Sequence, residues 1–333
     1  MTTDEDAGLA PLSPAELSRL EAEALARFGP MYAAMEVADW IRRIDPAIRN
    51  AADHAQGRWV DYDLTDASAD YPAPATPTRH STLICTTLRT GSTLLGESLY
   101  RVGGFGCPCE YYMQDVGPRL YGRWGAGNFP AFNTALLRHR TDATGAFGAK
   151  LFWLDTPNVL AGAGERAAAT TLRSAVDDPD SPAVAAINRT LAAALGRLLP
   201  NPRYVYLRRE DRVAQAVSTL IATQSGNWRS TDGITGTPTP VYSYPALFAL
   251  IGWFWRCDRH WEAFFRDTGI TPCRVAYSEL ETALGPTVRR IGETFGTPVA
   301  ESELALLERP RLQRQDSPLN QAFARRFLVE FRR

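Results

Sequence analysis

Short apolar runs recur along the chain from residue 81 onward, and each is followed by a stretch with helical spacing of apolar positions. The run Leu83–Thr87 predicts a buried strand, and the runs at Phe147–Leu154, Tyr204–Leu207 and residues 273–280 predict further strands. Strands that alternate with helices are typical of an α/β domain. We therefore expect an α/β fold with a mostly parallel sheet flanked by helices.

The stretches between these runs predict the flanking helices. Helical spacing indicates helices over Ser92–Val102, 181–199, Asp211–Thr223, 244–266 and Gly285–Phe295, with a final helix near the C-terminus. In sheets of this kind, ligands bind beyond the carboxyl ends of the strands. The loops after Thr87 and Leu207 are therefore the expected places for a site.

The N-terminal part of the chain predicts helices of its own. Ser13 is a good helix N-cap, with Pro14 at the first helical position and Glu16 three residues after the cap. A second helix is predicted over Met31–Arg43.

A proline-rich stretch, ADYPAPATPTRH, separates these helices from the alternating pattern and predicts a linker. At 333 residues, the chain is long enough for one large domain or two small ones. The sequence thus predicts a helical N-terminal extension with its linker, residues 1–80, and an α/β domain, residues 81–333.

The composition and charge exclude several classes of partner. Apolar residues make up 45% of the chain and charged residues 22%, which is ordinary for a protein that buries a core. The net charge of −1 produces no overall field that would favour nucleic acid. No apolar run reaches the length of a membrane span. We expect a small-molecule partner, and any anionic group must be held by a local cluster.

The cysteines predict neither disulfides nor a metal site. Their number, five, is odd, their spacing matches no disulfide framework, and no secretory segment opens the chain, so we expect a reduced, cytoplasmic protein. The Cys-Pro-Cys at residues 107–109 offers two soft ligands, and no nearby histidine or second pair completes a site. We therefore expect no metal.

The stretch LICTTLRTGSTLL predicts an anion-binding loop between a strand and a helix. A nucleotide-binding phosphate loop has the pattern G-x-x-x-x-G-K-[ST]. Here Gly91 keeps the second glycine, Ser92 replaces the lysine, and Arg89 brings a cation three residues before Ser92. Backbone N–H groups at the helix start would surround an anion without the magnesium apparatus of an NTPase. The alternative is an ordinary turn in which Ser92 caps the helix.

A second cluster follows the predicted strand Tyr204–Leu207. Arg209 comes at the strand end, and Ser218 lies on the helix after it. An arginine and a hydroxyl on a helix are well suited to grip a phosphate monoester. A ligand with one anionic group at residues 89–93 and a phosphate at Arg209 and Ser218 fits 3′-phosphoadenosine 5′-phosphosulfate (PAPS).

Five segments carry a family resemblance. They are LICTTLRTGSTLLGESL, GFGCPCEYY, GAKLFW, YLRREDRVAQAVSTLIATQSGNW and RVAYSELETALGPTVRRIGETFG. In that order they resemble segments of bacterial PAPS-dependent sulfotransferases, and most of all the trehalose 2-sulfotransferase family. The resemblance covers roughly residues 81–330 and implies the P-loop-like sulfotransferase fold.

The resemblance implies an enzyme of the EC 2.8.2 type. It would move a sulfonyl group from the co-substrate PAPS to a hydroxyl of a carbohydrate or natural-product acceptor, and release adenosine 3′,5′-bisphosphate. The family places a glutamate base in a Gly-x-Pro-x-Glu turn, which here is GCPCE with Glu110. The flanking Tyr111 and Tyr112 would form a wall near this base or contact a sugar ring.

The resemblance also assigns the binding residues. Arg89 and Lys150 would act on the transferring group, and the full set for PAPS is Arg89, Thr90, Gly91, Ser92, Thr93, Arg209, Ser218, Arg314 and Gln315. The last two lie in RLQRQ, which resembles a C-terminal PAPS-contacting loop. The helix after that loop usually carries a tryptophan in the family, and Phe323 occupies the region here.

Lys150 has a compositional argument of its own. It is the single lysine among 36 basic residues, the others being arginine. A lysine presents a compact point charge and an arginine a planar fork, so the two are not interchangeable. Lys150, at the head of a predicted strand, could therefore complete the grip on the sulfonyl group. The alternative is a surface lysine at a strand edge.

The sequence allows two interpretations for the tryptophans and histidines. Trp153 and Trp228 can stack on adenine or acceptor, and core packing is equally open. The four histidines, His54, His80, His139 and His260, lie in no matching motif, although a histidine base stays an alternative to Glu110.

Two other functions compete with sulfonyl transfer: a nucleotide or small-molecule kinase on the same scaffold, and a non-catalytic PAPS-binding relative. The missing loop lysine argues against the first, and the presence of Glu110 and Lys150 argues against the second. The acceptor and the role of residues 1–80 stay open, as does the oligomeric state, for which a homodimer is one option.

Overall fold

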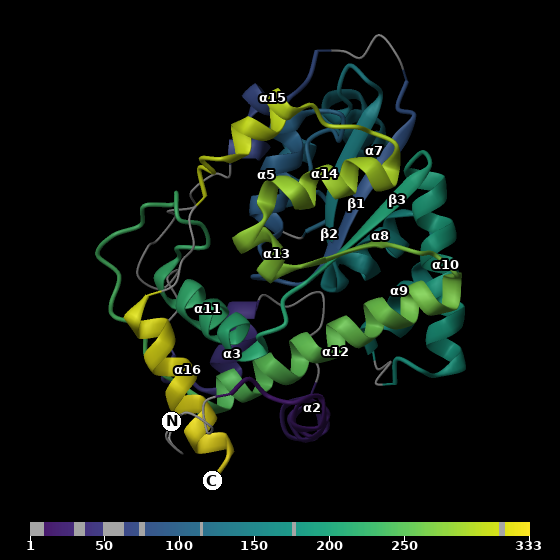
Figure 1. The fold of residues 1–333 in the computed structure, drawn as a ribbon. Coiled ribbons are helices and arrows are strands. Elements are labelled where there is room, and N and C mark those ends of the chain that lie inside the picture. The colour runs from purple at the N-terminus through teal and green to yellow at the C-terminus, as the bar shows by residue number, and fades with distance from the viewer. Residues whose placement is uncertain are drawn as a thin grey trace. The chain divides into compact units, whose positions relative to one another are not determined.

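The chain forms two compact units (Figure 1). A computed structural model describes residues 10–29, 37–48, 63–72, 77–113, 116–174, 178–312 and 317–333. Unit 1 comprises residues 1–60, 209–257 and 311–333, and unit 2 comprises residues 61–208 and 258–310. The predicted division of the chain at residue 80 remains a prediction.

Unit 2 contains the predicted parallel sheet. Within the described residues its strands have the order β2-β1-β3-β4, and every pairing is parallel. The strands are β1 (His80–Thr86), β2 (Ala146–Phe152), β3 (Pro202–Arg208) and β4 (Cys273–Ala276). The register of β1 with β2 sets Ile84 opposite Lys150. The predicted α/β class and parallel sheet are confirmed.

The helices of unit 2 cover this sheet. They are α5 (Ser92–Val102), α6 (Val116–Arg123), α7 (Phe129–Arg140), α8 (Thr156–Gly162), α9 (Arg166–Ser174), α10 (Pro182–Leu198), α13 (Tyr277–Thr282), α14 (Leu284–Phe295) and α15 (Glu301–Leu304). Short 3₁₀ turns are η1 (Asp63–Thr65), η2 (Ala67–Ala69), η3 (Trp153–Asp155) and η4 (Ala305–Leu307). Apolar side chains of β1, β3 and β4 pack against α5 and α14 in one buried cluster.

Two predicted strands were too long by two residues or more at their carboxyl ends. The strand predicted to reach Leu154 ends at Phe152, and η3 follows it. The run at 273–280 is a strand only as far as Ala276, and then α13 begins. Glu279 explains the second change, because its carboxylate accepts a hydrogen bond from the Ala276 N–H at 2.8 Å and so starts a helix.

Unit 1 is helical. It contains α2 (Pro14–Phe28), α3 (Val37–Ile44), α11 (Arg212–Ser225), α16 (Pro318–Phe331) and the first part of α12 (Tyr244–Thr268), which continues into unit 2. The predicted helix Met31–Arg43 is found over its later residues, and residues 31–36 lie outside the described residues. In the described part of the chain, no helix has the length and apolar character that crossing a membrane requires.

The N-terminal helix begins as its sequence predicts. The Ser13 hydroxyl accepts from the Glu16 N–H at 3.2 Å, and the Glu16 carboxylate accepts from the Ser13 N–H at 2.7 Å. Glu16 also accepts from Arg332 Nε at 3.1 Å, which ties α2 to the C-terminal end of the chain. The hydrogen bond from Arg332 is the main reason why the pKa of Glu16 falls from its ordinary 4.5 to about 2.

We expect Glu16→Gln to lower the free energy of unfolding by about 0.5–1 kcal/mol at pH 7, because glutamine keeps the capping acceptor and loses the ion pair. Folding favours the charged carboxylate, so its contribution is present above pH 4.5 and is lost as the pH falls toward 2. Urea unfolding at pH 7 and pH 3 should therefore show a difference that shrinks at pH 3. Glu23→Gln is the control, because the side chains of Glu23 and its partner Arg19 are each 58% exposed. It should change the free energy of unfolding little. A difference that is equal at both pH values would contradict the assignment.

Candidate active site

The loop between β1 and α5 has an unusual backbone. Gly91 is the N-cap of α5 with φ 81°, and Arg89 is also left-handed with φ 60°. A non-glycine residue adopts this conformation only when its surroundings hold it there, at a cost of order 1 kcal/mol. Buried Thr90 supplies part of this hold, because its hydroxyl meets that of Thr86 at 2.6 Å and donates to the Thr87 carbonyl at 3.1 Å.

Gly91 is required by its surroundings as well as by its φ angle. A Cβ at this position would lie 2.9 Å from Cδ2 of Tyr277 and 3.2 Å from Cδ1 of Leu280. The alternative that Ser92 caps α5 is wrong, because Gly91 is the N-cap and Ser92 is the first residue of the helix. The N-terminus of this 11-residue helix therefore follows the loop directly, and the N–H groups of a helix start can bind an anion.

The turn that carries Glu110 lies directly on β2. The backbone N–H of Lys150 donates to the Cys109 carbonyl at 2.8 Å, and Cys109 pairs with Ala149 as a parallel bridge. Glycines on both sides allow this approach. A Cβ on Gly106 would lie 2.6 Å from the Gly148 nitrogen, and one on Gly148 would lie 2.7 Å from Cγ of Pro108. The short distance between the turn and the strand is therefore fixed.

Lys150 joins the turn to the loop. Its Nζ lies 2.5 Å from Oε1 of Glu110 and donates to the Thr93 hydroxyl at 3.4 Å. The lysine side chain is fully buried, and the Glu110 side chain is 12% exposed. Lys150 lies inside β2, so its predicted place at the head of the strand is wrong, as is the alternative of a surface lysine. Its stem passes Gly96 of α5, where an added Cβ would come within 3.5 Å of Lys150 Cδ.

The second oxygen of Glu110 also has a partner. The Cys109 thiol donates to Oε2 at 3.5 Å. Burial, together with the neighbouring Glu110, raises the pKa of this thiol well above its ordinary value, so it remains a donor near neutral pH. The carboxylate is therefore held on one side by a cation and on the other by a thiol.

Together these groups are a helix N-terminus, a buried cation and a partly exposed carboxylate. They are contributed by α5, β2 and the turn 106–110, all within unit 2. Such a set can hold an anionic group, balance negative charge that develops on it, and accept a proton from a neighbouring hydroxyl.

Comparison with known proteins agrees with this chemistry. Residues 81–330 match the family described as Stf0 sulphotransferase. The chain belongs to the Stf0 sulphotransferase family. It is therefore a sulfotransferase, and the kinase and the non-catalytic binder are not supported.

Two curated relatives of this sulfotransferase carry the name trehalose 2-sulfotransferase. The protein of Mycobacterium tuberculosis is 30% identical over 247 residues, which cover 70% of this chain and 91% of the relative. The protein of Mycolicibacterium smegmatis is 25% identical over 264 residues, with the same shares of the two chains.

The second predicted cluster of the sulfotransferase belongs to unit 1. Arg209 directly follows β3 in the chain and is half-buried, and Ser218 is buried on α11. Arg314 and Gln315 lie outside the described residues. Phe323, where the family usually has a tryptophan, is buried with its ring 5.4 Å from that of Tyr242. The roles of these residues toward PAPS remain predictions.

Several aromatic residues have structural contacts where the sequence suggested ligand contacts. The Tyr111 hydroxyl donates to the Cys107 carbonyl at 2.5 Å, and that of Tyr112 donates to Asn133 at 3.3 Å. Both rings are buried, which does not fit a contact with a sugar ring, and their role as a wall near the base remains a prediction. Trp153 is buried and stacks on His260 at 4.8 Å, which favours its core-packing interpretation.

Two contacts near the loop between β1 and α5 were not predicted from the sequence. Trp261 Nε1 donates to the Thr86 carbonyl at 2.9 Å, and the Thr86 hydroxyl donates to the Leu207 carbonyl at 2.7 Å, which fixes the end of β1 to β3. Gly148 inside a predicted strand was an available signal, because such a glycine often marks close backbone approach. Among the described residues, no cluster of His, Cys, Asp and Glu suited to a metal ion is found.

Replacing Gly148 by alanine should displace the Glu110 turn. The new Cβ would overlap the Phe105 carbonyl and Pro108, and overpacking of this kind destabilises by about 1–3 kcal/mol. We expect a lower melting temperature together with a loss of turnover. Gly196→Ala, on helix α10 with nothing near the added Cβ, is the matched control and should be neutral or slightly stabilising. Wild-type stability and turnover in Gly148→Ala would show that the turn is not held in this way.

Proposed function

We propose that this sulfotransferase moves the sulfonyl group of PAPS to a hydroxyl of a carbohydrate acceptor such as trehalose, with Glu110 as the general base. The observation that carries the proposal is the position of Lys150, whose Nζ lies 2.5 Å from Glu110 and 3.4 Å from the Thr93 hydroxyl. A base, a cation and an anion-binding loop therefore lie within reach of one reacting group.

In this proposal the loop holds the 5′-phosphosulfate. The amides of Gly91, Ser92 and Thr93 and the guanidinium of Arg89 bind its oxygens. Thr90 contributes its backbone only, because its hydroxyl is engaged by Thr86 and Thr87. Arg209 and Ser218 bind the 3′-phosphate, and Arg314 and Gln315 complete the donor site.

The chemical step needs a proton acceptor and a place for charge. The acceptor oxygen forms a bond to sulfur while the bond between sulfur and the leaving phosphate oxygen breaks, and the hydroxyl proton goes to Glu110. Negative charge that grows on the phosphate is balanced by the loop amides, Arg89 and Lys150. Lys150 and the Cys109 thiol meanwhile keep the carboxylate oriented toward the incoming hydroxyl.

Two observations support a carboxylate rather than a histidine base. Glu110 is the partly exposed carboxylate beside the loop, whereas His260 is buried against Trp153 and His139 stacks on Trp124 at 5.1 Å. The name of the two relatives, trehalose 2-sulfotransferase, supports a disaccharide acceptor.

Transfer from ³⁵S-labelled PAPS tests the function directly. With trehalose, a monosaccharide, a phenol and a nucleoside offered separately, we expect the label in trehalose and release of adenosine 3′,5′-bisphosphate. The same bisphosphate should raise the melting temperature, since it binds only the folded protein, and ATP with magnesium should not. Label in the phenol or nucleoside alone would move the acceptor away from sugars, and no transfer to any hydroxyl would refute the proposal.

The base is tested by Glu110→Gln. We expect turnover to fall by about 10²–10⁴-fold, because the amide cannot take the proton, while the affinity for adenosine 3′,5′-bisphosphate changes by less than about threefold. Glu165→Gln is the control, since Glu165 forms an exposed pair with Arg197 at 2.7 Å, and it should keep full turnover. Unchanged turnover in Glu110→Gln would remove this residue from the role.

A further inference from the structure

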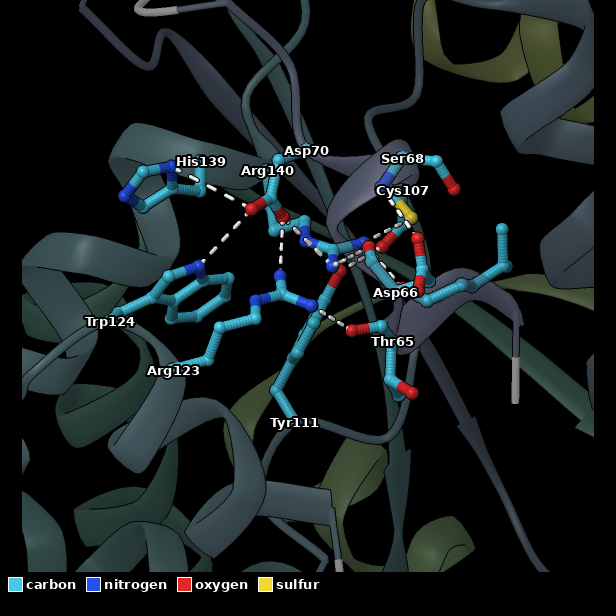
Figure 2. A network of polar contacts seen from close by, with 11 residues as sticks. Thr65, Asp66, Ser68, Asp70, Cys107, Tyr111, Arg123, Trp124, His139 and Arg140 are labelled. Atoms are coloured by element: carbon cyan, nitrogen blue, oxygen red, sulfur yellow. Dashed lines mark hydrogen bonds and ion pairs between the residues drawn. The ribbon is translucent and has the colours of Figure 1, made fainter. Parts of the chain in front are cut away.

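Arg140 is a fully buried arginine at the end of α7, and the mechanism above does not use it. Its guanidinium contacts residues in and beside the 3₁₀ turns η1 and η2. Nη1 donates to the Leu64 carbonyl at 2.5 Å, and Nη2 donates to the Asp66 carbonyl at 3.3 Å. Nη2 also lies 3.0 Å from Oδ1 of Asp70 (Figure 2).

The same guanidinium reaches the turn that carries Glu110. Arg140 Nη1 donates to Sγ of Cys107 at 3.1 Å, and the group lies over the Tyr111 ring at 5.8 Å. The Tyr111 hydroxyl closes the circle by donating to the Cys107 carbonyl at 2.5 Å. Cys107 and Tyr111 flank Glu110 in the sequence, so Arg140 holds both ends of the segment that presents the base.

Asp70 is the counter-ion that keeps Arg140 in place. Its carboxylate lies 2.6 Å from Arg123 Nη2 and accepts from Trp124 Nε1 at 3.3 Å, in addition to Arg140 (Figure 2). Arg123 also donates to the Thr65 carbonyl, and the backbone N–H of Tyr71 donates to the His139 carbonyl at 2.9 Å. The segment 64–71 is thus fastened to α6 and α7 by side-chain and backbone contacts.

This segment precedes the family match, which begins at residue 81. A buried guanidinium is tolerated only when its N–H groups and its charge are satisfied. Here two backbone carbonyls and one carboxylate of residues 64–70 satisfy the two Nη groups and the charge, whereas Nε is buried with no hydrogen-bond partner among the described residues. If these partners were lost, Arg140 would have to move toward other acceptors, and Cys107 would lose its contact.

We propose that Arg140 is a positioning residue for the Glu110 turn. Residues 64–70 hold the Arg140 guanidinium in a fixed position and so form part of the working catalytic site. This inference rests on the proposed role of Glu110 as the base. It predicts that a change at Asp70, a residue outside the family match, reduces the chemical step through Glu110 and leaves the donor loop 89–93 intact.

The test is a double-mutant cycle in the full-length chain. Asp70→Asn should lower kcat by about tenfold and change KM for PAPS by less than about twofold. In a Glu110→Gln background, the same Asp70→Asn change should lower the residual rate by less than about twofold, because the group that Arg140 positions is already gone. Asp180→Asn is the matched control, since Asp180 also pairs with two arginines but at an exposed position, and it should leave kcat unchanged.

Each outcome decides the inference. An equal loss from Asp70→Asn in both backgrounds, or no loss in either, would overturn it, since a general weakening of the fold is additive with Glu110→Gln. If Asp70→Asn does not fold, Arg123→Gln replaces it in the cycle, with an expected loss in kcat of about threefold that also vanishes beside Glu110→Gln. If Glu110 is not the base, the single variant Glu110→Gln shows this by itself, because it then keeps full turnover.

Discussion

The burial of one positive charge organises the candidate active site of this protein. Lys150 lies inside β2 with its side chain fully buried, and such a charge needs a partner in hydrogen-bonding contact. Glu110 is that partner, which requires the turn 106–110 to lie on the strand with almost no space between them. Gly106 and Gly148 provide the closeness, and Gly96 gives the lysine stem room along α5. The need to pair the buried charge of Lys150 therefore links the ion pair, the glycines and the position of the loop at residues 89–93.

Much of this arrangement could be predicted from the sequence, because it is encoded locally. The strand–loop–helix at residues 83–102 follows from an apolar run, a glycine and helical spacing. Membership of the sulfotransferase family likewise follows from short motifs. Glu110 and Lys150 were assigned by resemblance, 40 residues apart in the chain, and only the pairing of the turn with β2 shows how they meet.

What the sequence could not predict depends on contacts between distant residues. Tyr111 and Tyr112 follow the turn that carries Glu110 and look like ligand contacts in the sequence. Both rings are buried instead, since an aromatic residue beside a site is equally suited to the core. Arg140 and Asp70 are 70 positions apart, and neither lies in a motif. The end of β4 was misjudged because the capping effect of Glu279 outweighs the apolar run.

The isolation of Lys150 has a practical consequence for chemistry performed on this protein. Reagents that acylate amines have a single lysine side chain to modify, and the folded chain shields it completely. Its modification would require the structure around it to open, so the rate of acylation at Nζ would report how often the turn 106–110 separates from β2.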